Sequence, residues 1–270
     1  MALKQTDLKL MLETAVDAAR LAGNKAMEEI SKVKTWIKSA DQLVTQADGI
    51  CQQIIVDRIR RTYPYDGFIG EEGEKGRLFK QPPTGGEKVW WVIDPIDGTN
   101  NFAKGMFLFT IVIGAMHQGQ PVVGVTYDPG TDSMFTGVKG GQAQCNGEPI
   151  VVNDDEIDNF SSIGIDSHFN NGTPRWAIEL MRRSRFRNLG SSALQFAYLA
   201  KGGLIATIFA EPKLWDIAAG AVIAESAGAI VSDWLGNKIF PINLDKYEGE
   251  ELPTLGANKK VYRQILEMLK

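Results

Sequence analysis

The sequence predicts a mixed α+β and α/β fold, built as one large domain or as two closely packed subdomains. A length of 270 residues exceeds what most single small cores need. Short β-rich segments separated by turn residues follow one another over 107–152, as in an antiparallel sheet. From residue 161, strand-like and helix-like segments alternate, as in an α/β layer. We therefore expect subdomains 1–155 and 156–270, joined by the acidic linker at 153–159.

The composition is that of an ordinary globular protein, with 44% hydrophobic and 23% charged residues. A formal net charge of −4 argues against non-specific nucleic-acid binding. Cys51 and Cys145 have no zinc-ligand spacing, which favours reduced thiols. The amino terminus lacks an apolar signal core, and the longest apolar segment, Phe107 to Met116, is too short to span a bilayer. We expect a cytoplasmic protein without a membrane segment.

The first 61 residues predict two helices around a short strand. Apolar residues recur at helical spacing over 6–30, and the alanine-rich face suits close packing against another helix or a subunit. A strand is predicted at 32–38, a polar loop at 38–48 and a second helix at 48–61. The acids Asp41 and Asp48 are most simply loop and capping residues.

Two adjacent acids, Glu71 and Glu72, lie between glycines just after a short apolar segment. They form either a solvated turn or a site in which Glu71 faces the acids of the next strand. Residues 74–86 are rich in Gly, Pro and charge, which predicts a flexible surface loop.

The segment KVWWVIDPIDGTNNF, at 88–102, is the centre of the prediction. Its apolar run Val89 to Ile93 is typical of a strand buried on both faces. The strand ends in a turn that carries Asp94 and Asp97, whose carboxylates can face one point.

The residues after this turn favour anion binding. Gly98 permits close approach of a ligand to the backbone, and Thr99 and Asn100 are good helix starters whose N–H groups can point at the same spot. Carboxylates for a hard cation beside N–H groups for a phosphate suggest metal-dependent phosphoryl chemistry.

Two other interpretations of this motif remain. One is a plain Asp-Gly turn in which Asp94 is a cap. The other is the signature of haloacid-dehalogenase phosphatases, but there the two acids are two residues apart, whereas Asp94 and Asp97 are three apart.

Strands are expected at 107–117, 121–128, 133–138, 143–145 and 149–152, as an antiparallel meander. In the second half, strands are expected at 161–166, 186–189, 204–209 and 229–232, and helices at 174–183, 191–201, 214–228 and 258–270.

Two helix starts in the second half are candidate sites. N–H groups around Ser191 and Ser192 can bind a substrate oxygen, or simply begin a capped helix. Asp216 follows Glu211 at the start of another helix, where an acid is also favoured by the helix dipole.

Several catalytic classes are excluded. The two histidines, His117 and His168, lie in no metal-ligand pattern, and Cys51 with Arg58 falls within a helix pattern rather than a cysteine-phosphatase loop. No Walker A motif and no G-x-G-x-x-G after a strand occurs. Carboxylate-bound magnesium is the remaining chemistry.

Four motifs in this order resemble the inositol monophosphatase family, which belongs to the lithium-sensitive, magnesium-dependent superfamily that includes fructose-1,6-bisphosphatase. They are LVTQAD at 43–48, GEE at 70–72, WVIDPIDGTNNF at 91–102 and LWDIAAGAVIAESAG at 214–228. The resemblance covers essentially the whole chain. It implies a layered α-β-α-β-α fold, with an antiparallel sheet in the N-terminal half and a mixed sheet in the C-terminal half, and usually a homodimer.

The resemblance also implies a site for two or three Mg²⁺ ions. Glu71 would bind metal and, with Thr99, orient the attacking water. Asp94 would bridge two metals, and the remaining ligands would be the Ile96 carbonyl, Asp97 and Asp216. Asp48 would lie near a weaker third ion.

Substrate contacts are implied for the N–H groups of Gly98 and Thr99, and for Asp97, Ser191, Ser192 and Glu211. Glu211 lies five residues before Asp216 where the family usually has seven, and Gln42 and Lys104-Gly105 also depart from the common pattern. These departures leave the metal ligands intact and concern the leaving group. We expect hydrolysis of myo-inositol monophosphate; the alternatives are another phosphoester, such as histidinol phosphate, fructose-1,6-bisphosphate or another sugar phosphate, and a regulatory binding role.

Overall fold

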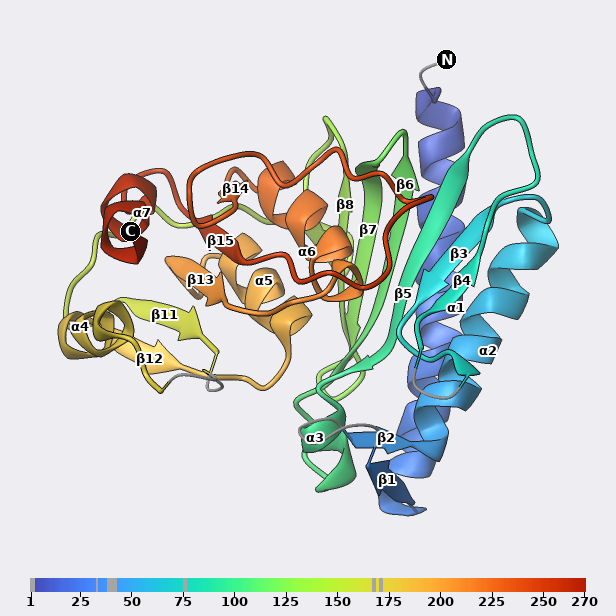
Figure 1. Cartoon of the computed structure of the whole chain (residues 1–270), viewed down its shortest axis with the longest axis horizontal. Helices are drawn as coiled ribbons and strands as arrows, with labels where there is room; N and C mark the ends of the chain where they lie inside the picture. Colours follow the sequence, from blue (N-terminus) through green and yellow to red (C-terminus); the bar gives the residue numbers. More distant parts are fainter. Residues whose placement is uncertain (1–2, 33, 38–42, 75–76, 167–168, 170–171) are drawn as a thin grey trace.

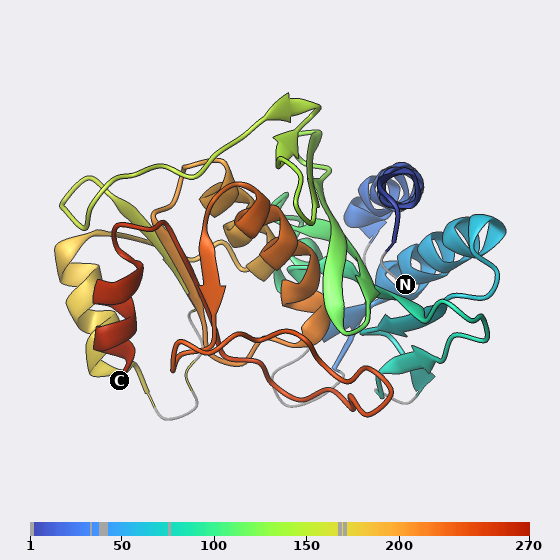
Figure 2. The same ribbon diagram turned by 90° about the horizontal axis from the view of Figure 1, so that it is seen from above.

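The computed structural model describes residues 3–32, 34–37, 43–74, 77–166, 169 and 172–270. Asp41, Gln42 and His168 lie outside these residues. Within them, two large β-sheets alternate with helical layers, as the sequence predicts (Figures 1 and 2). From one side to the other, the layers are α1 with α2, the eight-stranded sheet, α5 with α6, the five-stranded sheet, and α4 with α7.

The outer layer of the N-terminal half consists of α1 (Gln5–Glu29) and α2 (Gln46–Thr62). The alanine face of α1, including Ala15, Ala18 and Ala22, is fully buried because it packs on α2 and on the sheet. A 3₁₀ turn follows at Ile30–Lys32, and β1 (Thr35–Ile37) pairs with β2 (Leu43–Thr45). The predicted loop at 38–48 is therefore wrong for 43–45, where pairing with β1 extends the backbone.

The eight-stranded sheet has the order β10-β9-β8-β7-β6-β5-β3-β4. Its strands are β3 (Gly67–Gly70), β4 (Phe79–Gln81), β5 (Val89–Asp97), β6 (Thr110–His117), β7 (Gln120–Asp128), β8 (Ser133–Val138), β9 (Gln144–Cys145) and β10 (Glu148–Pro149). The predicted meander is present, and β5 is buried along its whole length. Both cysteines are free and buried.

Two predictions for this sheet were wrong. Residues 79–81 do not belong to a surface loop, because β4 pairs with the edge of β3 and the ring of Phe79 is half-buried. The sheet is also not wholly antiparallel, because β3 and β5 are parallel. The β3–β4 hairpin reverses the chain, so β5 starts at the end where β3 starts.

The C-terminal sheet has the order β12-β11-β13-β15-β14 and is mixed, as expected. Its strands are β11 (Ser162–Ile165), β12 (Arg185–Arg187), β13 (Ala206–Phe209), β14 (Ile230–Ser232) and β15 (Thr254–Ala257). Strand β15 was not predicted. The predicted subdomain boundary near residue 155 falls in the connection between the two sheets and stays a proposal.

The helices of this half are α4 (Arg175–Arg183), α5 (Ser192–Ala200), α6 (Leu214–Ser226) and α7 (Tyr262–Leu269). The predicted start of the last helix, at 258, was wrong by one turn, because the Asn258 side chain accepts hydrogen bonds from Lys260 and Val261 before the helix begins. No helix in the described part combines the length and the apolar character that crossing a bilayer requires.

Helix α6 lies between the two sheets and is almost entirely buried after its first turn, as its continuously apolar sequence requires. Glycines of the sheet allow its close approach. A Cβ atom on Gly124 would lie 2.4 Å from the Ala219 carbonyl oxygen, and one on Gly137 would lie 2.7 Å from the Ile223 Cα atom. Helix α6 is thereby packed closely on β7 and β8, and it also contacts β5 and β6.

We expect Gly124→Ala to lower the free energy of unfolding by about 1–3 kcal/mol, the usual cost of overpacking a close-packed core. Urea denaturation measures the loss. The control is Gly86→Ala, because a Cβ atom there meets no atom within 4 Å; we expect a change within about 0.5 kcal/mol. Equal stability of the two variants would contradict close packing of α6 on the sheet.

Candidate metal centre

An irregularity in strand β5 brings the side chains of Asp94 and Asp97 to the same side of the strand. Residues three apart point to opposite faces of a regular strand. The pairing of β5 with β6, however, shifts register between Asp94 and Asp97, as at a β-bulge. An Asp94 carboxylate oxygen, Oδ1, accepts a hydrogen bond from the Ile96 N–H at 3.0 Å. Both carboxylates are buried, and the shift lets them share one side.

The first turn of α6 adds a third acid. One Asp216 oxygen, Oδ2, accepts a hydrogen bond from the Lys213 N–H at 2.5 Å, which fixes the half-buried side chain at the helix start. One carboxylate oxygen from each of Asp94, Asp97 and Asp216 lies within 4.8 Å of the others. The structure thus brings together acids that are 122 positions apart in the sequence.

Electrostatics oppose this arrangement unless a cation is bound. Burial is the largest cause that raises the pKa of Asp94 well above its usual value, followed by the charges of Glu71 and Asp97. Burial likewise raises the pKa of Asp216, helped by the charges of Asp97 and Glu71. Three hard oxygen donors at this spacing are the ligand type that Mg²⁺ prefers. The donor set therefore fits a divalent cation of that class.

Asp97 also joins the two halves of the molecule. Its Oδ2 atom accepts hydrogen bonds from the Ser191 hydroxyl at 2.6 Å and from the Ala193 N–H at 2.7 Å, and its Oδ1 atom accepts one from the Ser192 N–H at 3.3 Å. Burial raises the pKa of Asp97, and these bonds oppose the rise. The N–H groups that the sequence suggests for a substrate oxygen thus bind this carboxylate.

The turn after β5 is shaped by close approach of the backbone. Gly98 has a φ of 99°, and a Cβ atom there would lie 2.9 Å from the Leu108 carbonyl oxygen. The short helix α3 (Thr99–Ala103) begins directly after it. The Thr99 hydroxyl lies 3.0 Å from the Ile96 carbonyl oxygen and 3.3 Å from Asp48 Oδ1. Thr99 thus links the turn after β5 to α2.

Asp48 is fully buried in the first turn of α2. It accepts a hydrogen bond from the Thr45 N–H at 2.8 Å and another from the Thr45 hydroxyl, so the predicted capping role is present. Burial raises its pKa to about 6, although the bonds from Thr45 act against the rise. A carboxylate beside the Thr99 hydroxyl is suited to accept its proton.

Glu71 follows β3, and its N–H donates to the Ile93 carbonyl of β5 at 3.3 Å. The side chain is half-buried, the bonded Ile93 directly precedes Asp94, and the charge of Glu71 raises the pKa of both Asp94 and Asp216. Gln52 of α2 holds the next residue, because its amide group bonds both the N–H and the carbonyl of Glu72. No local pattern predicts this role of Gln52, because it depends on a contact between α2 and Glu72.

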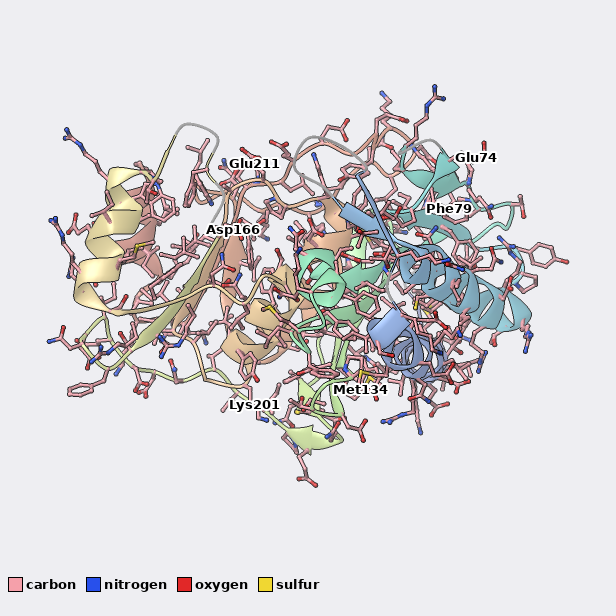
Figure 3. All side chains as sticks on the ribbon, turned by 90° about the horizontal axis from the view of Figure 1, so that it is seen from below. Glu74, Phe79, Met134, Asp166, Lys201 and Glu211 are labelled. Carbon is pink, nitrogen blue, oxygen red and sulfur yellow. The ribbon has the colours of Figure 1, made fainter. Side chains whose placement is uncertain are left out.

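Asp166 is an acid of this region that the sequence did not single out. It follows β11, and its Oδ2 atom accepts a hydrogen bond from the Ala210 N–H at 3.0 Å. Burial raises its pKa to about 6, and the charges of Asp97 and Glu211 add to the rise. Glu211, a predicted substrate contact, is half-buried near Asp166 (Figure 3).

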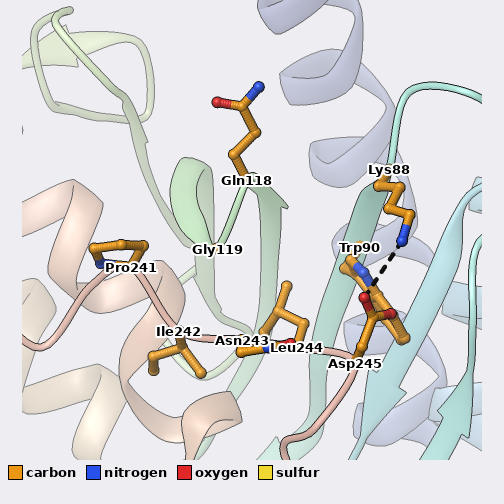
Figure 4. Close-up of a pocket in the computed structure, with 9 residues that line it drawn as sticks. All are labelled: Lys88, Trp90, Gln118, Gly119, Pro241, Ile242, Asn243, Leu244 and Asp245. Carbon is orange, nitrogen blue, oxygen red and sulfur yellow. Dashed lines mark hydrogen bonds and ion pairs between the residues drawn. The ribbon is translucent and has the colours of Figure 1, made fainter.

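A separate cavity of about 380 Å³ lies at the opposite end of β5 (Figure 4). Its walls include Lys88, Trp90 and the segment 241–245, and an ion pair of 3.4 Å joins Lys88 to Asp245 at its rim. Strand β5 runs from this cavity to the acids, so the cavity is distinct from the candidate metal centre.

Comparison with known proteins identifies the family and the fold. The model of the inositol monophosphatase family matches residues 7–268. A Vibrio cholerae relative named Nus factor SuhB is 35% identical over 237 residues, 84% of this chain and 86% of that protein. Extragenic suppressor protein suhB of Bartonella henselae has a TM-score of 0.85 at 26% identity, covering 97% of this chain and 98% of that chain.

Inositol monophosphatase II of Staphylococcus aureus has been solved with inositol monophosphate bound. It has a TM-score of 0.76 at 26% identity, covering 96% of this chain and 92% of that chain. The same protein has also been solved with 2′-AMP bound.

We expect Asp94→Asn to stabilise the metal-free protein and to weaken its response to metal. Because the folded-state pKa of Asp94 is raised, stability falls as pH rises through the window between its ordinary and raised values, and the penalty is present at neutral pH. Asparagine is neutral and therefore removes this loss of stability. In EDTA at pH 7, the melting temperature should rise by about 2 °C or more, the shift that roughly 1 kcal/mol produces in a chain of this size.

Mg²⁺ should then raise the melting temperature of the wild type much more than that of Asp94→Asn, since a ligand stabilises the state that binds it. The matched control is Glu225→Gln, which removes a carboxylate at the other end of α6 and should keep the wild-type response. An equal response of Asp94→Asn and wild type to Mg²⁺ would contradict the assignment of Asp94 as a ligand.

Proposed function

The chain belongs to the inositol monophosphatase family, and we propose that it is a Mg²⁺-dependent phosphomonoesterase that hydrolyses myo-inositol monophosphate to inositol and phosphate. The observation that carries the proposal is the convergence of Asp94, Asp97 and Asp216 within 4.8 Å, beside the Thr99–Asp48 pair. The Staphylococcus aureus relative with bound inositol monophosphate supports the substrate.

In this proposal, Glu71, Asp94 and the Ile96 carbonyl would hold one ion, Asp94, Asp97 and Asp216 would hold a second, and Asp48 would lie near a weaker third. When bound, Mg²⁺ neutralises the charge of a phosphate ester and lowers the pKa of an attacking water. The chain's own contribution is to align these carboxylates before the substrate arrives, through the main-chain hydrogen bonds to Asp94 and Asp216. The inhibition by lithium that the family implies belongs to the same proposal.

Proton transfer is assigned to the pair formed by Thr99 and Asp48. The Thr99 hydroxyl can accept a hydrogen bond from the attacking water while it donates to Asp48, 3.3 Å away. Asp48 is suited to hold the proton because burial raises its pKa to about 6. Glu71 orients the same water, and the N–H groups of Gly98 and Thr99 bind the phosphate.

The leaving alcohol would bind on the side of the site that is formed by Ser191, Ser192 and Glu211. Ser191 and Ser192 would act mainly through Asp97, because both donate hydrogen bonds to it. Another small phosphomonoester is the nearest alternative substrate, favoured by the relative that binds 2′-AMP. The homodimer and the cytoplasmic location stay predictions.

A regulatory binding role is a second candidate function, because the Vibrio cholerae relative is named a Nus factor. Such a role would act through protein contacts and would not need the metal ligands. The two functions are therefore separable by a variant that lacks catalysis.

We expect magnesium-dependent phosphate release from a panel of monoesters, with myo-inositol 1-phosphate hydrolysed fastest and with EDTA abolishing release. Released phosphate is measured for wild type and for Asp97→Asn, which should be inactive. Faster release from another ester would replace only the substrate. No release from any ester, together with rescue of a deletion strain by Asp97→Asn, would favour the regulatory role.

We expect Thr99→Val to lower kcat by roughly 10²–10⁴-fold, the usual contribution of a positioned proton-transfer group. Valine keeps the shape of threonine and removes the hydroxyl that reaches Asp48. Thr99→Ser is the matched control, since it keeps the hydroxyl and should retain most of the activity. Turnover by Thr99→Val close to that of wild type would exclude this assignment.

A further inference from the structure

Three parallel strands of the C-terminal sheet end at the candidate site. β12, β11 and β13 are neighbours and run in the same direction. Ligands of such sheets bind beyond the carboxyl ends of the parallel strands. The segment after β12 supplies Ser191 to Asp97, and the segment after β13 supplies Asp216. The remaining strand end, that of β11, presents Asp166.

The position of Asp166 is fixed by the end of β13. Its main-chain N–H donates to the Ile208 carbonyl at 3.3 Å, and its Oδ2 atom accepts from the Ala210 N–H at 3.0 Å. Backbone and side chain are thus both anchored. Figure 3 shows Asp166 and Glu211 in the same region, and the charge of Glu211 helps to raise the pKa of Asp166.

Asp166 lies near the three clustered acids and is not among the residues that the proposed function assigns to metal. Its pKa is raised by burial and by the charges of Asp97 and Glu211, and its own charge raises the pKa of Asp216. The group whose oxygens lie within 4.8 Å of one another is Asp94, Asp97 and Asp216. Because β11 and β13 are parallel neighbours, and the Ala210 N–H after β13 donates to Asp166, the end of β11 brings Asp166 to the side of the centre from which Asp216 comes.

The chemistry of a carboxylate decides what Asp166 can recognise there. An ionised carboxylate only accepts hydrogen bonds, and its two oxygens can accept several. Among the described residues, the Ala210 N–H donates one hydrogen bond to the Asp166 carboxylate. A phosphate dianion offers no donor and is repelled by the carboxylate, whereas an alcohol offers hydroxyl donors. A hydrogen bond to a charged group contributes roughly 10- to 100-fold in binding when both partners are in place.

We propose that Asp166 determines specificity by accepting hydrogen bonds from hydroxyl groups of the leaving alcohol, which selects polyol phosphates over esters whose alcohol carries no further hydroxyl. This inference rests on the proposed phosphatase function. It assigns a residue from the end of β11, beside Glu211 from the end of β13, to the recognition of the alcohol.

The test compares kcat/KM for myo-inositol 1-phosphate and for phenyl phosphate, whose leaving group has no additional hydroxyl. The ratio of the two values should fall about tenfold in Asp166→Asn, which loses the charge, and roughly 10- to 100-fold in Asp166→Ala, which loses the acceptor. Asp155→Asn removes the same charge from the exposed linker and should keep the ratio within about twofold.

The effect of Mg²⁺ on melting temperature is measured on the same variants, since a specificity residue should leave it unchanged. A ratio in Asp166→Ala equal to that of wild type would overturn the inference, and so would loss of the response to Mg²⁺, which would make Asp166 a metal ligand. If the wild type is active and Asp166→Ala keeps the wild-type ratio, only this inference is overturned. An inactive wild type overturns the proposed function as well.

Discussion

Mutual repulsion among buried carboxylates is the constraint on which the rest of the structure depends. Burial raises the pKa of Asp94, Asp97 and Asp216, and neighbouring charges add to the rise at Asp94 and Asp216, so the fold must hold these acids in place at a cost. It does so with main-chain donors. Asp94 accepts from an N–H of its own turn, whereas Asp97 and Asp216 accept from N–H groups at the starts of α5 and α6. A bound cation would neutralise these charges, and the relief of that unfavourable energy would contribute to its affinity.

These donors can reach Asp97 and Asp216 only if α5 and α6 are held in position, and close packing holds them there. Gly124 and Gly137 let α6 touch the eight-stranded sheet, and a Cβ atom on Gly220 of α6 would lie 2.6 Å from the Phe196 ring of α5. The two helices therefore approach the sheet and each other closely. Because protein interiors are close-packed, a shift at this interface would move the helix starts and the carboxylates they hold.

The parts of the site that depend on local sequence were predictable. Asp94 and Asp97 are separated by a short turn after an apolar strand, and Asp216 stands in the first turn of an apolar helix, so each carries a local signal. Asp166 and Gln52 carry none. Their roles follow from the pairing of β11 with β13 and from the contact of α2 with Glu72, which are non-local. Strands β4 and β15 were missed for the same reason, since each is short and defined by its neighbour.

In the proposed mechanism, the residues that bind metal and phosphate and the residues that bind the alcohol come mainly from different halves of the chain. Apart from Asp216, the residues assigned to metal and phosphate come from the N-terminal half, through Asp48, Glu71 and the turn after β5. The residues assigned to the alcohol come from strand ends of the C-terminal sheet. Substitutions at these strand ends can therefore change the leaving group while the metal ligands stay in place. Function follows from such sites rather than from the fold, which is consistent with one family whose members are named both phosphatases and Nus factors.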